Sequence, residues 1–218
     1  MTSYRLHCFA QSGNAYKVAL LLQALKVSWT PVHVPFAEFI GGLTRTDAWR
    51  QSNNAMGEVP ILDTGSESLT QSGAILSWLA REHGAFGGGN ENEQQDVLRW
   101  LFFDNHKFTS YFATLRFNKA FGTAEPDPAV VKFLRGRVDN AFGIVDKHLA
   151  SRDYIVGTAP TIADMSLCGY LFYPPEESGI DVAAQFPSIG RWLERLKKLP
   201  GFKPPYELMP GEKLTPKW

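Results

Sequence analysis

Ser12, Gly13 and Asn14 stand where a β-rich segment gives way to a helical pattern. A serine there can cap the helix, because its oxygen can accept a backbone N–H group of the first turn. The position also suits activation of a thiol, since free amides and the positive end of the helix dipole favour a thiolate. A hydroxyl that donates to the sulfur would favour the charged form further. Position alone leaves both interpretations open.

Two other short motifs could hold a ligand. Val59-Pro60 lies at the start of a short β segment, where a proline removes a donor from strand pairing. Either it is an edge-strand proline, or a cis peptide bond turns the backbone groups of Val59 toward a ligand. Gln71-Ser72 opens a later helix, where the serine is either a cap or, with the glutamine amide, part of a carboxylate site.

Strand and helix signals alternate over residues 1–83 in the order β-α-β, a connecting segment, then β-β-α. This order predicts two parallel strands with a right-handed crossover and an antiparallel hairpin at one edge. The connecting segment, 35–57, is expected to be irregular. The expected strands are 4–9, 29–34, 59–63 and 67–70, and the expected helices are 13–25 and 72–83.

The glycine-rich stretch 84–92 predicts a linker, and strand signals vanish after it. Residues 93–218 form the second expected unit, an all-helical domain that ends in a proline-rich, irregular strap. Its helical periodicity runs over 93–121, 128–150, 161–172 and 187–199.

Composition argues against several classes of function. Lys and Arg together number 22, as do Asp and Glu, so the balanced charge gives no reason to expect nucleic acid or an anionic membrane as a partner. No apolar run approaches the roughly 20 residues of a membrane span, and none resembles a signal peptide. The histidines and cysteines lack metal-ligand spacing, so no metal is expected. Cys8 and Cys168 are expected to be reduced, buried thiols of a cytoplasmic protein.

Short motifs in a fixed order resemble the cytosolic glutathione transferase family. Residues 12–18, 57–62 and 69–76 are similar to its N-terminal half, and 154–164 and 186–202 are similar to a helix-capping motif and the last core helix of its C-terminal half. The resemblance covers about residues 4–202. It implies a thioredoxin-like α/β domain over 1–83, which binds glutathione, followed by an all-α domain over 93–218.

The resemblance also implies roles for individual residues. It is to the serine-type, theta-like bacterial members, in which the serine matched by Ser12 donates to the glutathione sulfur; Asn14 is the rival donor. Val59, held by a cis Pro60, would pair through its backbone with the cysteinyl part of glutathione. Gln71 and Ser72 would hold the γ-glutamyl carboxylate.

Other residues are assigned structural roles or depart from the family pattern. Thr161 and Asp164 would form a capping box, and Arg116 is expected to be a buried ion-pair partner. The catalytic cysteines of the omega, beta and zeta classes fall at Ser12 and Asn14, so a mixed disulfide with glutathione is not expected there. Glu58 replaces a common Lys or Gln and would repel the glycyl carboxylate unless a basic residue intervenes.

The second-substrate pocket is expected between the Ser12 turn and the aromatic-rich helix that begins near Glu93. Phe103 and His106 are the candidate pocket residues for an apolar ligand. Most of the other aromatic side chains would pack between helices or at the homodimer contact that the resemblance implies.

The leading hypothesis is a transferase that activates its co-substrate glutathione as a thiolate for attack on a small hydrophobic electrophile, or for reduction of a peroxide. One alternative is a disulfide-handling thiol transferase, which the missing cysteines disfavour. The other is a non-catalytic, glutathione-transferase-like binding or structural protein.

Overall fold

A four-stranded sheet forms one layer of the N-terminal unit in the computed structural model, which describes residues 4–218. The strand order is β2-β1-β3-β4. The parallel β1–β2 pair and the antiparallel β3–β4 hairpin are as the sequence predicts, and β3 joins the sheet antiparallel to β1. The strands are β1 (Tyr4–Cys8), β2 (Trp29–His33), β3 (Ile61–Asp63) and β4 (Ser68–Thr70).

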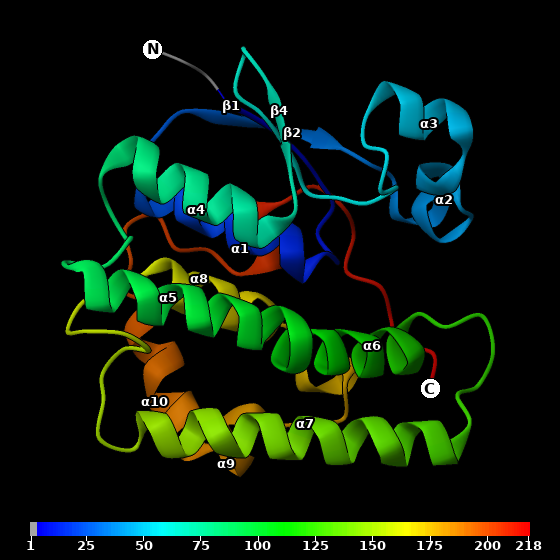
Figure 1. Cartoon of the computed structure of the whole chain (residues 1–218). Helices are drawn as coiled ribbons and strands as arrows, with labels where there is room; N and C mark the ends of the chain where they lie inside the picture. Colours follow the sequence, from blue (N-terminus) through cyan, green and yellow to red (C-terminus); the bar gives the residue numbers. More distant parts are fainter. Residues whose placement is uncertain (1–3) are drawn as a thin grey trace.

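Two helices, α1 (Gly13–Ala24) and α4 (Ser72–His83), lie together between this sheet and the helical unit (Figure 1). Nearly every residue of α1 is buried, including the whole run from Ala15 to Leu22. A helix that is apolar on all sides must be covered on all sides, and α1 meets the sheet on one side and the helical unit on the other. The start of α1 therefore lies at the boundary of the two units.

The segment 35–57 is not irregular, which corrects the sequence prediction. It holds α2 (Phe36–Ile40), a 3-10 turn η1 (Leu43–Arg45) and α3 (Asp47–Ser52). Thr46 caps α3 by accepting the N–H of Trp49 at 3.3 Å. Gly41-Gly42 and Asn53-Asn54 are typical of loops, but here Gly41 ends α2 and Asn53 ends α3.

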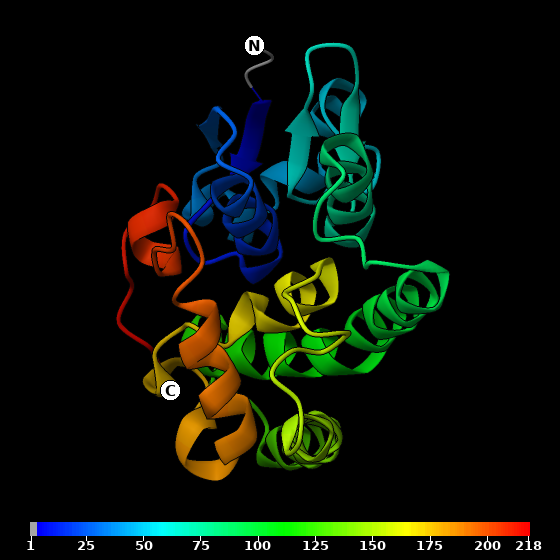
Figure 2. The ribbon, with the colours of Figure 1, turned by 90° about the vertical axis from the view of Figure 1, so that its left-hand side faces the viewer.

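The C-terminal unit is helical throughout, and α7 runs alongside the long rod formed by α5 and α6 (Figures 1 and 2). A π-helical segment η2 (Asp104–Phe108) joins α5 to α6, so the predicted helix over 93–121 is one rod with a widened turn. The remaining tail is irregular except for one helical turn, α11. The elements are α5 (Glu91–Phe103), α6 (Thr109–Ala120), α7 (Pro128–Leu149), α8 (Ile162–Leu167), η3 (Cys168–Tyr170), η4 (Pro175–Glu177), α9 (Val182–Gln185), α10 (Pro187–Leu196) and α11 (Pro205–Leu208).

The predicted capping box at the start of α8 is present. The Thr161 hydroxyl accepts the N–H of Ala163, and the Asp164 carboxylate accepts the N–H of Thr161 at 2.8 Å. Asp164 also accepts from the indole N–H of Trp192 at 2.8 Å. One buried carboxylate thus joins α8 to α10 in the core of the helical unit.

A buried ion pair fixes the two units against each other. Lys17 Nζ on α1 donates to the Asp104 carboxylate at 2.6 Å, and neither side chain is exposed to solvent. Asp104 also accepts from the hydroxyls of Thr109 and Ser166, so its charge is fully hydrogen-bonded. Removal of one partner of such a pair typically costs about 3–5 kcal/mol. The pair holds α1 in a defined position against η2 and α8.

Candidate active site

Ser12 is the N-cap of α1. Its backbone is extended, and its Oγ accepts the N–H of Ala15 at 3.2 Å. The cap uses a lone pair of the hydroxyl and leaves its proton available. The cap interpretation is therefore confirmed, and it does not compete with donation to a thiolate.

A cavity of about 320 Å³ opens beside this turn. Ser12 and Asn14 form its polar end, and most of the remaining wall is apolar, which is typical of a small-molecule site. The lining comes from the turn before α1 and its first residues, from α2, from the segment before β3, from α6 and from η3. The lining residues are Phe9, Gln11, Ser12, Asn14, Phe36, Phe39, Glu58, Val59, Ala113, Thr114, Arg116, Phe117, Phe121 and Tyr170.

The helical unit orients the turn before Ser12. Arg116 on α6 donates to the carbonyl oxygen of Gln11 at 2.8 Å, and the hydroxyl of Tyr173 donates to the carbonyl oxygen of Ala10 at 2.7 Å. Arg116 is buried and paired with Glu177 at 2.6 Å, which confirms it as a buried ion-pair partner. Its guanidinium also stacks on the ring of Tyr173, 3.7 Å from the ring centroid.

The C-terminal tail holds the same turn from another side. The N–H of Ala10 donates to the carbonyl oxygen of Pro210 at 2.7 Å, and the Gln11 amide donates to that of Glu212 at 2.6 Å. Further along, the N–H of Lys217 donates to the carbonyl oxygen of Ala120 at the end of α6. The tail is thus a strap that crosses from the Ser12 turn to the far end of the cavity wall.

Of the residues assigned to glutathione binding, Val59 lies beside the Ser12 turn, and Gln71 is joined to the neighbouring Glu58. The Val59–Pro60 peptide is cis, and Val59 lines the cavity. Gln71 has a φ of 66°, which a side chain other than glycine rarely adopts. Its amide donates to the Glu58 carboxylate at 3.0 Å. Gln71, not Ser72, occupies the N-cap position of α4 and makes no side-chain cap bond, so the cap interpretation of Ser72 does not hold.

Two predicted pocket residues do not line the cavity. Phe103, at the end of α5, packs against the rings of Trp100 and Phe108, with centroids 5.4 and 6.4 Å away. His106 is exposed in the π-helical segment. The π-helical segment separates α5 from α6, and α6 is the part of the rod that faces the Ser12 turn. The cavity therefore lies beside α6. The aromatic wall on this side is instead formed by Phe117 and Phe121.

Outside α6 the lining contains four aromatic residues that the sequence patterns do not assign to the pocket, namely Phe9, Phe36, Phe39 and Tyr170. Phe36 and Phe39 have the i, i+3 spacing of a short helix after Pro35, a signal that was available in the sequence. Tyr170 lies within the predicted helical stretch 161–172, and only the packing of α8 and η3 against α1 brings it to the cavity.

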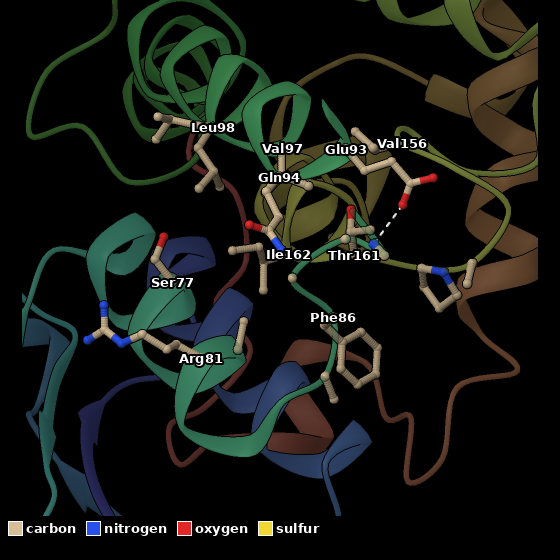
Figure 3. Close-up of a pocket in the computed structure, with 18 of the residues that line it drawn as sticks. Ser77, Arg81, Phe86, Glu93, Gln94, Val97, Leu98, Val156, Thr161 and Ile162 are labelled. Atoms are coloured by element: carbon tan, nitrogen blue, oxygen red, sulfur yellow. Dashed lines mark hydrogen bonds between the residues drawn. The ribbon is translucent and has the colours of Figure 1, made fainter. Parts of the chain in front are cut away.

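A larger hollow of about 880 Å³ lies between α4, the glycine-rich linker and α5 (Figure 3). Arg81 and Gln94 face it from the two helices, and the Glu93 carboxylate at its rim accepts the N–H of Gly89 at 2.7 Å. None of the residues assigned to catalysis or glutathione binding lines this hollow. Chemistry is therefore assigned to the smaller cavity, where a helix start and a hydroxyl face an apolar wall.

Other reactive centres are not apparent in the part of the chain that the structure describes. Burial raises the pKa of the Cys8 thiol to about 12 and raises that of Cys168 as well, so neither is a ready nucleophile. Residues 4–218 contain no cluster of three His, Cys, Asp or Glu side chains that could hold a metal ion. Over the same residues, every helix is too short or too polar to span a bilayer.

Two family models match this chain over most of its length. The model described as "Glutathione S-transferase, N-terminal domain" matches residues 6–91, and "Glutathione S-transferase, C-terminal domain" matches residues 105–200.

Individual relatives differ in the functions that their names state. Elongation factor 1-gamma 3 of Oryza sativa is 23% identical over 91% of this chain, which spans only 47% of that relative. Disulfide-bond oxidoreductase YfcG of Escherichia coli is 26% identical, with 88% of this chain and 89% of the relative covered. The crystal structure of a glutathione S-transferase from Pseudomonas fluorescens superimposes with a TM-score of 0.81 at 29% identity, and covers 93% of this chain and 98% of that one.

Proposed function

Because this chain belongs to the glutathione S-transferase family, we propose that it binds glutathione at the start of α1 and activates its thiol as a thiolate. The thiolate would then attack an electrophilic carbon of a small apolar substrate, or reduce a peroxide. Glutathione is the nucleophile, and the protein contributes thiolate stabilisation and proximity.

The observation that carries this proposal is the geometry of Ser12. Its oxygen is held by the Ala15 N–H at 3.2 Å while the residue lines the cavity. The hydroxyl proton is therefore available beside a helix start, where a negative charge is favoured. Asn14 lines the same end of the cavity and remains the rival donor.

The rest of glutathione would extend from Ser12 toward α4. The backbone of Val59 would pair with the cysteinyl part, beside Pro60, and Ser72 would help to bind the γ-glutamyl carboxylate at the start of α4. The rare backbone conformation of Gln71 supports a binding role, since such conformations cluster at ligand sites. The Glu58 carboxylate accepts from the Gln71 amide at 3.0 Å, and it would lie near the γ-glutamyl end, where the ligand also carries an ammonium group.

The second substrate would occupy the apolar half of the cavity. Phe36 and Phe39 of α2 and Phe117 and Phe121 of α6 form that half. We propose these residues in place of Phe103 and His106, which lie outside the lining. Four aromatic rings around about 320 Å³ favour a small, flat, apolar electrophile.

A homodimer is part of the proposal. Leu98 and Phe102 lie one turn apart on α5 and are 42% and 67% exposed. Exposed apolar residues that gather on one helix face are typical of a subunit contact. The hollow beside α5 in Figure 3 borders this face.

Two other activities are less well supported. A thiol transferase that forms a mixed disulfide with its own cysteine would need a reactive thiol at the cavity, and both cysteines are buried elsewhere. A non-catalytic role is suggested by the name of the elongation factor relative. Such a role would not explain why Ser12 lines a cavity.

The test is calorimetry with glutathione, followed by activity against a panel of aryl halides, epoxides and hydroperoxides. Binding with saturable turnover of one class is the expected result. Binding without any turnover would favour the non-catalytic alternative, and absence of binding at millimolar glutathione would refute the proposal.

A further inference from the structure

Tyr170 reaches the start of α1 from the helical unit. It is the last residue of η3, and its ring packs so closely on Gly13 that a Cβ atom there would lie 2.4 Å from a ring carbon. A Cβ atom on Gly169 would likewise lie 2.5 Å from Lys17 Cγ. These two glycines permit a close approach that any other residue would prevent.

The surroundings of the Tyr170 hydroxyl make it a hydrogen-bond donor. Burial raises the pKa of Tyr170, while the nearby Arg116 charge and the backbone amides of Asn14 and Gly13 lower it; the balance leaves the pKa above its ordinary value. The phenol therefore keeps its proton at neutral pH. A protonated phenol can donate one hydrogen bond, and this is the bond that Tyr170 can offer to a ligand in the cavity.

The neighbouring tyrosine shows the contrast. Tyr173 donates its proton to the carbonyl oxygen of Ala10, whereas the Tyr170 proton meets no acceptor within residues 4–218. Tyr170 lines the cavity together with Ser12 and Asn14. Its hydroxyl is thus placed at the same helix start as that of Ser12, on the opposite unit.

Most charged groups around this point are paired with each other, so stabilisation of a thiolate here depends on the hydroxyls and on the helix start. Arg116 on α6 lies 5.7 Å from the Tyr170 ring and is balanced by Glu177 behind it. Asp104 is paired with Lys17. Glu58, on the far wall, already accepts from Gln71.

From this geometry we infer that Tyr170 is a second catalytic hydroxyl, which donates to the glutathione sulfur together with Ser12. The inference rests on the proposed function. Both hydroxyls keep their protons: the thiol proton leaves to water, the sulfur forms the bond to carbon, and the leaving group departs with its electron pair. The thiolate is then held between the two units, with one donor from each.

The test compares Tyr170→Phe with Tyr16→Phe in the full-length protein. Tyr16 is a matched control because its buried hydroxyl donates to the carbonyl oxygen of Lys203 at 2.9 Å, away from the cavity. Ultraviolet titration of bound glutathione thiolate is expected to show a pKa about one unit higher in Tyr170→Phe, a tenfold lower thiolate-to-thiol ratio at neutral pH. Tyr16→Phe should titrate as wild type. Affinity for S-methylglutathione, which has no thiol proton, should stay within about twofold in both variants.

A second measurement keeps the inference testable if Tyr170→Phe folds poorly. Incorporation of 3-fluorotyrosine at position 170 makes the phenol more acidic and a stronger donor, so the bound thiol should titrate at lower pH. An unchanged titration in the fluorinated protein or in folded Tyr170→Phe would overturn the inference. If wild-type protein binds neither glutathione nor S-methylglutathione, the proposed function itself fails.

Discussion

The most direct test of the site is the removal of the Ser12 hydroxyl. In Ser12→Ala, the thiolate loses a charge-assisted hydrogen bond, a class of bond that contributes about 1.5–3 kcal/mol. Each pKa unit corresponds to about 1.4 kcal/mol, so the bound thiol pKa should rise by about one to two units. A bond to the charged form lowers a thiol pKa, and its loss must therefore raise it. Turnover near neutral pH should fall about ten- to a hundredfold, while affinity for glutathione changes little.

The same substitution also removes a helix cap, and the two effects must be separated. Loss of the bond between Ser12 Oγ and the Ala15 N–H should cost about 0.5–2 kcal/mol of unfolding free energy. Asn90→Ala is a matched control, because the Asn90 side chain caps α5 by accepting the N–H of Glu93 at 3.0 Å. The control should lose similar stability in thermal unfolding and keep the wild-type thiol titration.

Ultraviolet titration of bound thiolate in Ser12→Ala and Asn14→Ala decides between the two candidate donors. We expect Ser12→Ala to shift the titration and Asn14→Ala to leave it nearly unchanged. If only Asn14→Ala shifts it, catalysis is assigned to Asn14 and Ser12 is a helix cap alone. If neither does, the first turn of α1 is not where the sulfur binds.

Three further outcomes are expected. Gln71→Ala should weaken glutathione binding by about 1–3 kcal/mol, the cost of an underpaired charged partner; wild-type affinity in calorimetry would refute the carboxylate assignment. The protein should have a dimeric mass by light scattering at micromolar concentration, and Phe102→Glu should shift the mass toward that of a monomer. Phe133 on α7 is 56% exposed, and Phe133→Glu is the control that should leave the mass unchanged. A monomeric wild type would contradict the proposal. Arg116→Lys should lower turnover at least tenfold, because a lysine cannot hold both Glu177 and the turn before Ser12. Arg135, which pairs with Asp139 on α7, provides the control variant Arg135→Lys. Equal turnover in the two variants would show that Arg116 does not position the turn.

Patterns local in sequence predicted the fold well. The helix over 72–83 and the capping box at Thr161 are signalled by residues within a turn or two of each other, and both form as expected. The short helices of 35–57 are not evident from the sequence, because glycine and asparagine are typical of loops, although here they end one-turn helices.

The cavity wall was harder to predict, because it depends on contacts between distant segments. Phe103 and Phe117 lie on the same rod, and the sequence does not show that the π-helical segment places only the second at the Ser12 turn. Tyr170 can reach the cavity only because Gly13 and Gly169 have no side chains and allow α1 and η3 to approach closely. These two glycines are 156 residues apart in the chain. Helical periodicity describes the face of one helix, and it carries no information on which distant turn that face meets.

The two buried ion pairs give a physical reason why the helical unit, rather than β1, directs Ser12. A buried pair such as Lys17–Asp104 often adds no more stability than an apolar contact of the same volume, since desolvation offsets the Coulombic attraction. Its effect on geometry differs, however. Charged hydrogen bonds form in only one relative position of the two helices, whereas apolar surfaces can slide past each other. Lys17–Asp104 fixes α1 along the helical unit, and Arg116–Glu177 fixes the donor to the Gln11 carbonyl oxygen, directly before Ser12. We interpret the pairs as the device that keeps the serine hydroxyl and the aromatic wall of α6 at a constant separation, which a reaction between two bound substrates requires.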